Sequence, residues 1–207
     1  MKMMATATAV AFVVYSCKGK LGEAEQLDLE DTPTQVVNDM FVVQTENGNM
    51  KMRAEAPRME KYSKGDTLDY ELFPEGFFVY GYDEQGRLET EIVADNARHM
   101  KYDDKRETWE AFGNVVVKNL INQEVVETDT LYWDQENEKI YTHCYVRMYS
   151  PDGFMQGYGM ESDQRARSTI LHNNFNNYAI VVKDSTQVLI DSDNFIGRFQ
   201  KNSCRLR

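Results

Sequence analysis

Apolar and polar residues alternate in many short runs after position 35, and this alternation constrains the fold more than any other feature. A period of two places successive side chains on opposite faces of an extended strand, as in a half-buried β-sheet. The run Leu88–Met100 is one example. Short acidic, Asn-rich or Gly-rich breaks of hairpin-loop composition separate the runs: Glu46–Asn49, Asp83–Gly86, Asp103–Lys105, Asp134–Asn137 and Pro151–Gly153. The pattern predicts an all-β domain of antiparallel hairpins.

The chain also repeats itself. Three short phrases that end in Asp95, Asp129 and Asp163 are spaced 34 residues apart, and Met50–Tyr62 resembles Thr90–Tyr102. We interpret each unit as an ascending strand, an Asp-rich turn and a returning strand. Repeats of this kind cannot bury an apolar face alone, so we expect them to stack into a long sheet folded on itself around a dry interior.

Two of the returning strands match each other at a shift of 31 residues. Along each of them, alternation places successive side chains on two opposite faces. One face is aliphatic and fairly small, and it either lines a groove or fills an ordinary core. Its members are our candidates for the interior: Trp109, Ala111, Val115, Val117, Ile140, Thr142, Val146 and Met148. The opposite face carries an aromatic stripe, Tyr141, Tyr145 and Tyr149, which we expect to point outward.

The charge balance restricts the classes of partner. The chain has 34 acidic residues against 23 Lys and Arg, for a net charge of −11. This balance argues against general nucleic-acid binding, which needs a basic surface, and against electrostatic docking onto anionic lipid.

The segment Met1–Cys17 has one Lys, then apolar or small residues, then Ser-Cys. Its apolar stretch is shorter than the roughly 20 residues that a bilayer-spanning helix needs, and it suits a secretory signal. Val14-Tyr15-Ser16-Cys17 resembles a bacterial lipoprotein signal, in which Cys17 would be lipidated. The alternative is an uncleaved anchor helix, and both tether the chain to a membrane. Residues 18–35 are polar and charged, which predicts a flexible linker.

Three segments carry a family resemblance: GNVVVKN from Gly113, EVVETDTLYWDQENEKIYT from Glu124 and GFMQGYGMESDQ from Gly153. They resemble the LptC family, the membrane-anchored periplasmic component of lipopolysaccharide export, and more broadly the LptA/OstA-type β-repeat domains. The resemblance implies an open V-shaped β-jellyroll, or β-taco, over residues 36–184 and no catalytic activity. It leaves residues 185–207 as an unassigned tail, and we expect no cofactor.

The resemblance also implies a function and partners. An LptC-like protein accepts lipopolysaccharide from an inner-membrane ATP-driven transporter and passes it to the periplasmic bridge protein LptA. The open sheet edges would pair with these neighbours by strand addition, Val36–Val43 with the transporter and Asn177–Asp184 with an LptA-like protein. The eight interior candidates would bind acyl chains. The expected location is the periplasm, anchored to the inner membrane.

Other functions remain open at this point. An anchored β-rich surface lipoprotein that binds glycans or proteins is the main alternative, and the aromatic stripe supports it. A glycosidase would need two carboxyl groups in a cleft, and no motif indicates such a pair. His99, His143 and His172 have no second His or Cys two or four residues away, so no metal site is expected. A disulfide between Cys144 and Cys204 is possible but has no support in the sequence.

Overall fold

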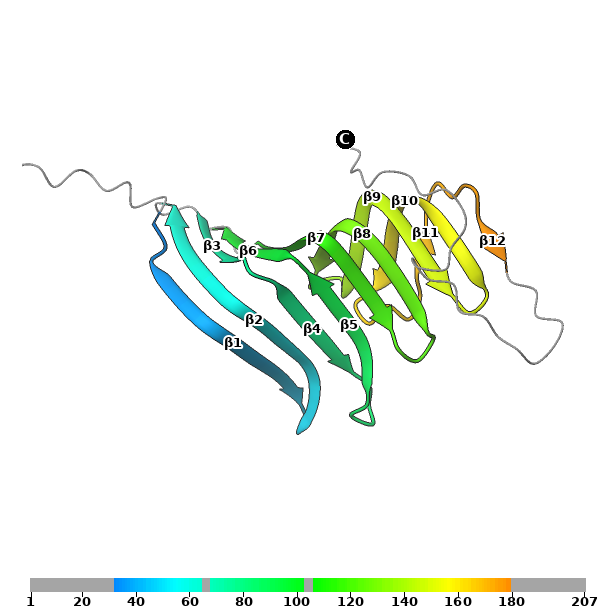
Figure 1. Ribbon diagram of the computed structural model, residues 1–207. Helices are drawn as coiled ribbons and strands as arrows, with labels where there is room; N and C mark the ends of the chain where they lie inside the picture. Colours follow the sequence, from blue (N-terminus) through cyan, green and yellow to red (C-terminus); the bar gives the residue numbers. More distant parts are fainter. Residues whose placement is uncertain (1–31, 65–67, 103–105, 180–207) are drawn as a thin grey trace, which may run out of the picture.

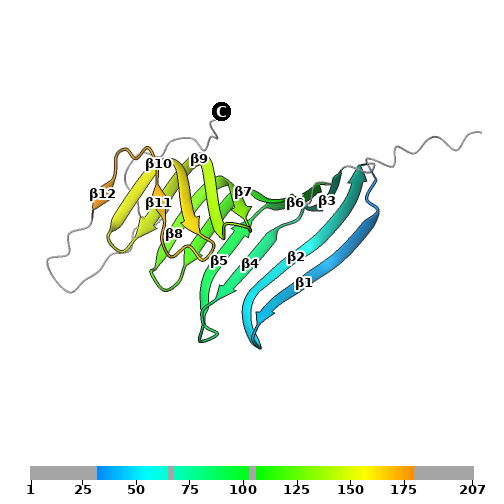
Figure 2. The same cartoon turned by 180° about the vertical axis from the view of Figure 1, so that it is seen from behind.

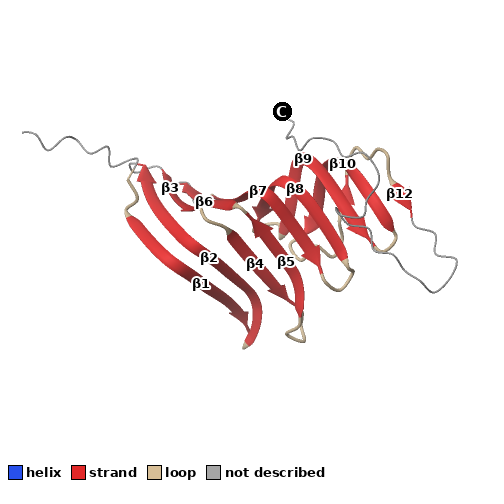
Figure 3. Cartoon of the chain, viewed as in Figure 1, coloured by secondary structure: helices blue, strands red, loops and turns tan. Residues whose placement is uncertain are grey.

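The computed structural model of the protein describes residues 32–64, 68–102 and 106–179. These residues form one 12-stranded sheet with antiparallel ladders and no helix (Figures 1 and 3), which confirms the predicted all-β class. The described part accordingly contains no helical segment with the length and apolarity that a bilayer crossing needs. The expected signal or anchor at residues 1–17 with Cys17, most of the linker and the tail lie outside the described residues.

Ten long or medium strands and two short ones make up the sheet. They are β1 (Gln35–Glu46), β2 (Asn49–Lys64), β3 (Leu68–Phe73), β4 (Phe77–Tyr82), β5 (Leu88–Ala94), β6 (Asn96–Tyr102), β7 (Glu107–Asn119), β8 (Glu124–Asp134), β9 (Lys139–Ser150), β10 (Gly153–Asp163), β11 (Ile170–Leu171) and β12 (Tyr178–Ala179).

The sheet folds into two walls because β2 and β7 each divide their pairing between two partners. Residues 52–55 of β2 pair with β4, and residues 60–64 pair with β3. Residues 116–119 of β7 pair with β5, and residues 107–112 pair with β6. We call the two sides the β4–β5 wall and the β3–β6 wall. Strands β8, β9 and β10 run through both walls, so the two meet along a crease that Figure 1 shows from the side.

Unusual backbone conformations mark the crease. Asp39 (φ 51°), Gly113 (φ 78°), Asn114 (φ 46°) and Gly159 (φ 88°) all adopt left-handed conformations, which Gly accepts freely and Asn and Asp more readily than most residues. A Cβ at Gly113 would lie 3.0 Å from the Cβ of Asp95, so the crease needs glycine there. The Asn114 side chain donates a hydrogen bond of 2.6 Å to Asp95 Oδ2, which ties β7 to the link between β5 and β6.

The interior is filled at one end of the V. Buried aliphatic side chains from β7 to β10 meet between the walls, and Val115 and Val146 have no exposed surface. A second cluster with fewer members lies under β2 to β6: Ala54, Ala56, Phe73, Phe77 and Ala97. The view from behind in Figure 2 shows β11 and β12 beside β10 at the filled end and β1 as the free edge at the other.

The predicted outward stripe of tyrosines lies on the outer face but is buried at two of its three positions. Tyr145 and Tyr149 are each only 1% exposed, whereas Tyr141 is half-buried. The chain after β10 returns along the outer face and places Phe175 against Tyr145, with ring centroids 6.4 Å apart. The Tyr145 hydroxyl donates to Gln156 Oε1 over 2.6 Å. The stripe is therefore a packed layer at this end of the sheet, because a later segment covers it.

Candidate functional site

A groove of about 900 Å³ lies between the two walls at the β1 end of the V. The exposed surface of its lining is mainly apolar, and the apolar residues come from eight of the strands. The apolar lining residues are Met40, Val42, Met52, Ala54, Phe73, Phe77, Val79, Ile92, Trp109, Ala111, Leu131, Trp133 and Ile140. A groove of this size lies near the upper end of the range for small-molecule sites.

Strand alternation and side-chain size together create the groove. On β1, Met40 and Val42 face the groove, while Phe41 and Val43 are exposed and do not line it. On the neighbouring β2 the inward residues include Ala54, which is too short to reach the opposite wall. At the other end of the V the inward positions carry Val, Ile, Leu and Met, which meet and close the interior. The groove therefore exists where Ala54 leaves the space between the walls unfilled.

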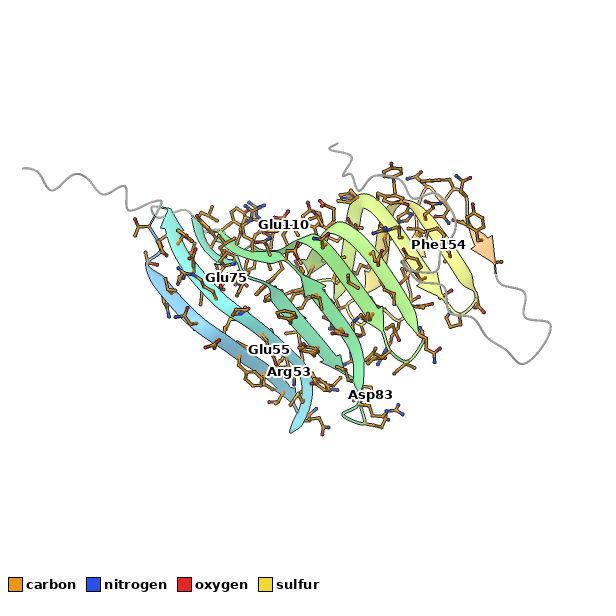
Figure 4. The ribbon with its side chains drawn as sticks, viewed as in Figure 1. Arg53, Glu55, Glu75, Asp83, Glu110 and Phe154 are labelled. Atoms are coloured by element: carbon orange, nitrogen blue, oxygen red, sulfur yellow. The ribbon has the colours of Figure 1, made fainter. Side chains whose placement is uncertain are left out.

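Residues that alternate with the lining stay outside it. Figure 4 labels Arg53 and Glu55 on β2, the two neighbours of Ala54. They form an ion pair of 2.9 Å, and the Arg53 guanidinium lies 4.2 Å from the ring centroid of Tyr80. The outer side of this strand is thus charged and aromatic, and the inner side is apolar.

Aromatic rings form the middle of the β3–β6 wall. Trp109 stacks on His99 with ring centroids 4.0 Å apart and an angle of 11° between planes. Phe73 lies 6.1 Å and Trp133 6.0 Å from Trp109. The indole N–H groups of Trp109 and Trp133 are buried and have no hydrogen-bond partner among the described residues. The rings present a stiff apolar surface to the groove.

His99 is held in place by two carboxylates. Its Nδ1 lies 3.0 Å from Glu71 Oε2 and its Nε2 lies 3.0 Å from Glu107 Oε2. The residue is only 4% exposed. With a carboxylate at each ring nitrogen, the imidazole has no freedom to rotate away, and it fixes the plane on which Trp109 stacks.

The rim of the groove is polar. Lys51 pairs with Glu84 at 2.8 Å on the β4–β5 side, where Asp83 shapes the hairpin turn (Figure 4). The hydrogen bond and positive charge of Lys51 lower the pKa of Glu84. Lys101 and Glu71 line the groove on the β3–β6 side. An apolar floor with a charged rim can hold the apolar part of an amphiphile and leave its polar part in water.

The eight interior candidates fall into two groups. Three of them line the groove: Trp109, Ala111 and Ile140. The other five are 0–4% exposed in the filled part of the V and do not line it: Val115, Val117, Thr142, Val146 and Met148. Alternation predicted which side these residues face, but not where the interior is open. Lipid binding by any of them stays a prediction.

Much of the lining was missed by sequence reasoning. Met40, Val42, Met52 and Val79 lie on strands β1, β2 and β4. The signal was available, because the same alternation runs through these strands. The prediction followed only the two best-matched repeats.

Among residues 32–64, 68–102 and 106–179, no three His, Cys, Asp or Glu side chains come together in a way that would hold a metal ion. Cys144 is buried on β9 and takes part in a disulfide. Cys204, its possible partner in the sequence analysis, lies outside the described residues.

Comparison with protein families identifies a related group. A family model described as "Lipopolysaccharide-assembly, LptC-related" matches residues 3–179. No curated protein matches the chain.

Proposed function

Because the chain belongs to the LptC-related family of lipopolysaccharide-assembly proteins, we propose that it is a non-catalytic lipid carrier of the lipopolysaccharide transport pathway. It accepts lipopolysaccharide from an inner-membrane ABC transporter and passes it to an LptA-like bridge protein. It works in the periplasm, tethered to the inner membrane through its N-terminal segment, either by lipidation of Cys17 or by an anchor helix.

The observation that carries this proposal is the groove with its apolar floor and charged rim. Transfer of one CH₂ group from water to an apolar site is worth roughly 0.8 kcal/mol. An acyl chain of about a dozen carbons would gain on the order of 10 kcal/mol by this measure. A carrier needs only to match the affinity of the next carrier, so energy supplied upstream can move the lipid forward.

We propose that the lipid is held by its chains and not by its head group. Lipopolysaccharide is anionic, and the chain carries a net charge of −11. The cations at the rim already pair with acids, as Lys51 does with Glu84 and Lys101 with Glu71. Neutralising Lys and Arg residues at the rim should therefore leave lipid binding largely intact.

The two sheet edges differ in their readiness for partners. Strand β1 pairs only with β2 among the described residues, and Val36, Phe41, Val42 and Val43 are exposed along it. An exposed edge of 12 residues is a template for strand addition, which supports the proposed contact with the transporter. The edge of β10 is covered by β11 and β12. An LptA-like partner would therefore add beyond β12, where residues 180–184 lie outside the described part.

Photocrosslinking in cells tests the carrier function. A photoreactive residue at Val42 or Met52, both in the groove lining, should give adducts with lipopolysaccharide. The same residue at Val43, on the outer side of β1, is the matched control and should give none. Positions Val115 and Val146 are unsuitable because they are fully buried. A folded, anchored protein without adducts at either groove position would refute the proposal.

The alternative function, a surface lipoprotein that binds glycans or proteins, loses its main support. It depended on an exposed row of three tyrosines, and two of them are buried.

A further inference from the structure

The groove is open at one end only. At the β1 end it runs out past the free edge strand. At the other end it stops against the filled interior, where Val115, Val117 and Val146 leave no space. An acyl chain lying in this groove can extend past β1, and its inner tip stops at the filled interior.

Two residues form the boundary between groove and core. Leu131 on β8 and Ile140 on β9 both line the groove and both belong to the buried core cluster. They are 4% and 2% exposed, so each shows only a small surface to the groove and packs into the core with the rest. Together they are the end wall of the groove.

A short segment closes the side of the groove next to the end wall. Residues 163–169, which we call the strap, leave β10 on the β3–β6 wall and cross to the β4–β5 wall. Thr90 Oγ1 donates to the Arg165 carbonyl over 2.7 Å, and Asn119 Nδ2 donates to the Ala166 carbonyl over 2.9 Å. The Ala166 side chain is buried in the core cluster.

The strap is also fixed by charge. Arg167 Nη2 donates to Glu89 Oε2 over 2.7 Å, and Arg165 Nη1 lies 3.9 Å from the same oxygen. Gln164 and Arg165 line the groove from the strap side. The blind end is therefore walled by side chains from three separate parts of the chain, each held by packing or hydrogen bonds.

From this arrangement we infer that the end wall, Leu131 and Ile140 behind the strap, limits the length of acyl chain that the groove accepts. The inference rests on the proposed carrier function. An acyl chain whose tip stops before the end wall gains binding free energy with each added methylene. An acyl chain whose tip has reached the wall gains no binding free energy from further methylenes, because these must bend back or stay in water.

Binding of a homologous series of saturated fatty acids to the purified full chain tests the inference. Affinity should rise about fourfold with each methylene, the factor that corresponds to about 0.8 kcal/mol, up to a break length beyond which it stays level. Leu131→Ala, which removes part of the end wall, should move the break to longer chains. Ala111→Leu, which fills the groove in front of the wall, should move it to shorter chains.

Met148→Ala is the matched control, because Met148 is as buried as Leu131 and belongs to the same core cluster but does not line the groove. The break length of this variant should equal that of the unaltered protein. Leu131→Ala and Ala111→Leu act in opposite directions, so either folded variant suffices. Fatty acids that bind without a break, or with the same break in all variants, would overturn the inference and leave the carrier function standing. Absence of binding at every length would overturn the carrier function itself.

Discussion

Glu89 on β5 and Arg167 in the strap are joined by two hydrogen bonds, although they are far apart in the sequence. Arg167 Nη2 donates to Glu89 Oε2 over 2.7 Å, and Nε donates to Oε1 over 2.5 Å. The Glu89 side chain is 4% exposed and that of Arg167 is 46% exposed. The hydrogen bond to Glu89 raises the pKa of Arg167. This pair connects the two walls across the mouth of the V.

Removal of the arginine should weaken the fold. Arg167→Ala leaves a buried carboxylate without its main partner, and we expect a loss of about 2 kcal/mol in the free energy of unfolding. This is below the usual cost of breaking a buried pair, because Arg167 is half exposed and Arg165 lies nearby. Urea unfolding followed by circular dichroism would measure it. Lys118→Ala breaks the more exposed Lys118–Glu91 pair and should cost less than about 1 kcal/mol. Equal losses of unfolding free energy in the two variants would contradict a special role for the Glu89–Arg167 pair.

A charge on the groove side of β1 should abolish lipid binding. Val42→Glu places a carboxylate in the apolar lining, and we expect affinity for a fatty acid to fall more than tenfold, or over about 1.4 kcal/mol. Val42 is 49% exposed, so the fold should tolerate the change. Val43→Glu is the same substitution one residue along, on the outer side, and should bind normally. Isothermal titration of both variants would decide, and equal affinities would argue against lipid in the groove.

The crease should be sensitive to a single methyl group. Gly113→Ala must adopt a left-handed conformation and also brings a Cβ to 3.0 Å from the Cβ of Asp95, so we expect a loss of about 2–3 kcal/mol. Gly48→Ala has a similar φ of 81° but meets no atom within 4 Å, and it should lose about 1 kcal/mol. Thermal unfolding of both variants gives the comparison. If Gly48→Ala proves the more damaging, the close contact at the crease is not important.

The covered edge of β10 predicts how an LptA-like partner docks. Glu161 and Ile170 are directly paired and both exposed, so cysteines at these positions are suited to a disulfide that locks β11 onto β10. If the partner adds beyond β12, the locked protein should bind it as well as the unaltered protein does. A pull-down of both proteins without reductant, which leaves the disulfide of Cys144 intact in each, would measure this. Loss of binding in the locked protein alone would mean that the partner displaces the covering segment.

One pH effect follows from a pair of neighbours on β2. The Tyr62 hydroxyl donates to Glu60 Oε2 over 2.7 Å and lowers the pKa of that carboxyl. The same bond raises the pKa of Tyr62 to about 12. A lowered carboxyl pKa contributes stability that is present above the unfolded value and is lost as the pH falls through the folded value. Tyr62→Phe should therefore cost about 1 kcal/mol at neutral pH and progressively less below about pH 4.

Urea unfolding at neutral and at acid pH would measure this difference. Tyr80→Phe keeps its ring against Arg53 and should show no such pH dependence. A Tyr62→Phe loss that is the same at both pH values would rule out Glu60 as its source.

The sequence determined the class of fold, the turns and the side of each strand that faces inward. These features depend on residues close together in the chain, because a period of two and a turn-forming break are local. The alternation of Trp109, Ala111, Val115 and Val117 therefore predicted one shared face. Locality also explains a failure: Leu88–Met100 looks like one continuous run, yet it divides at Asp95 into β5 and β6. The division occurs because the crease passes there, at the point where β7 changes its pairing from β6 to β5.

Only the tertiary structure decided where the interior is open and what stays exposed. Whether an inward valine is groove or core depends on the size of the side chain across the V, which comes from a strand far away in the sequence. Val115 meets such partners and is buried, whereas Val42, whose neighbour on β2 is the small Ala54, lines the open groove. Burial of Tyr145 likewise depends on Phe175, and closure of the groove on the contact between Glu89 and Arg167. These are contacts between distant segments, and no local pattern encodes them.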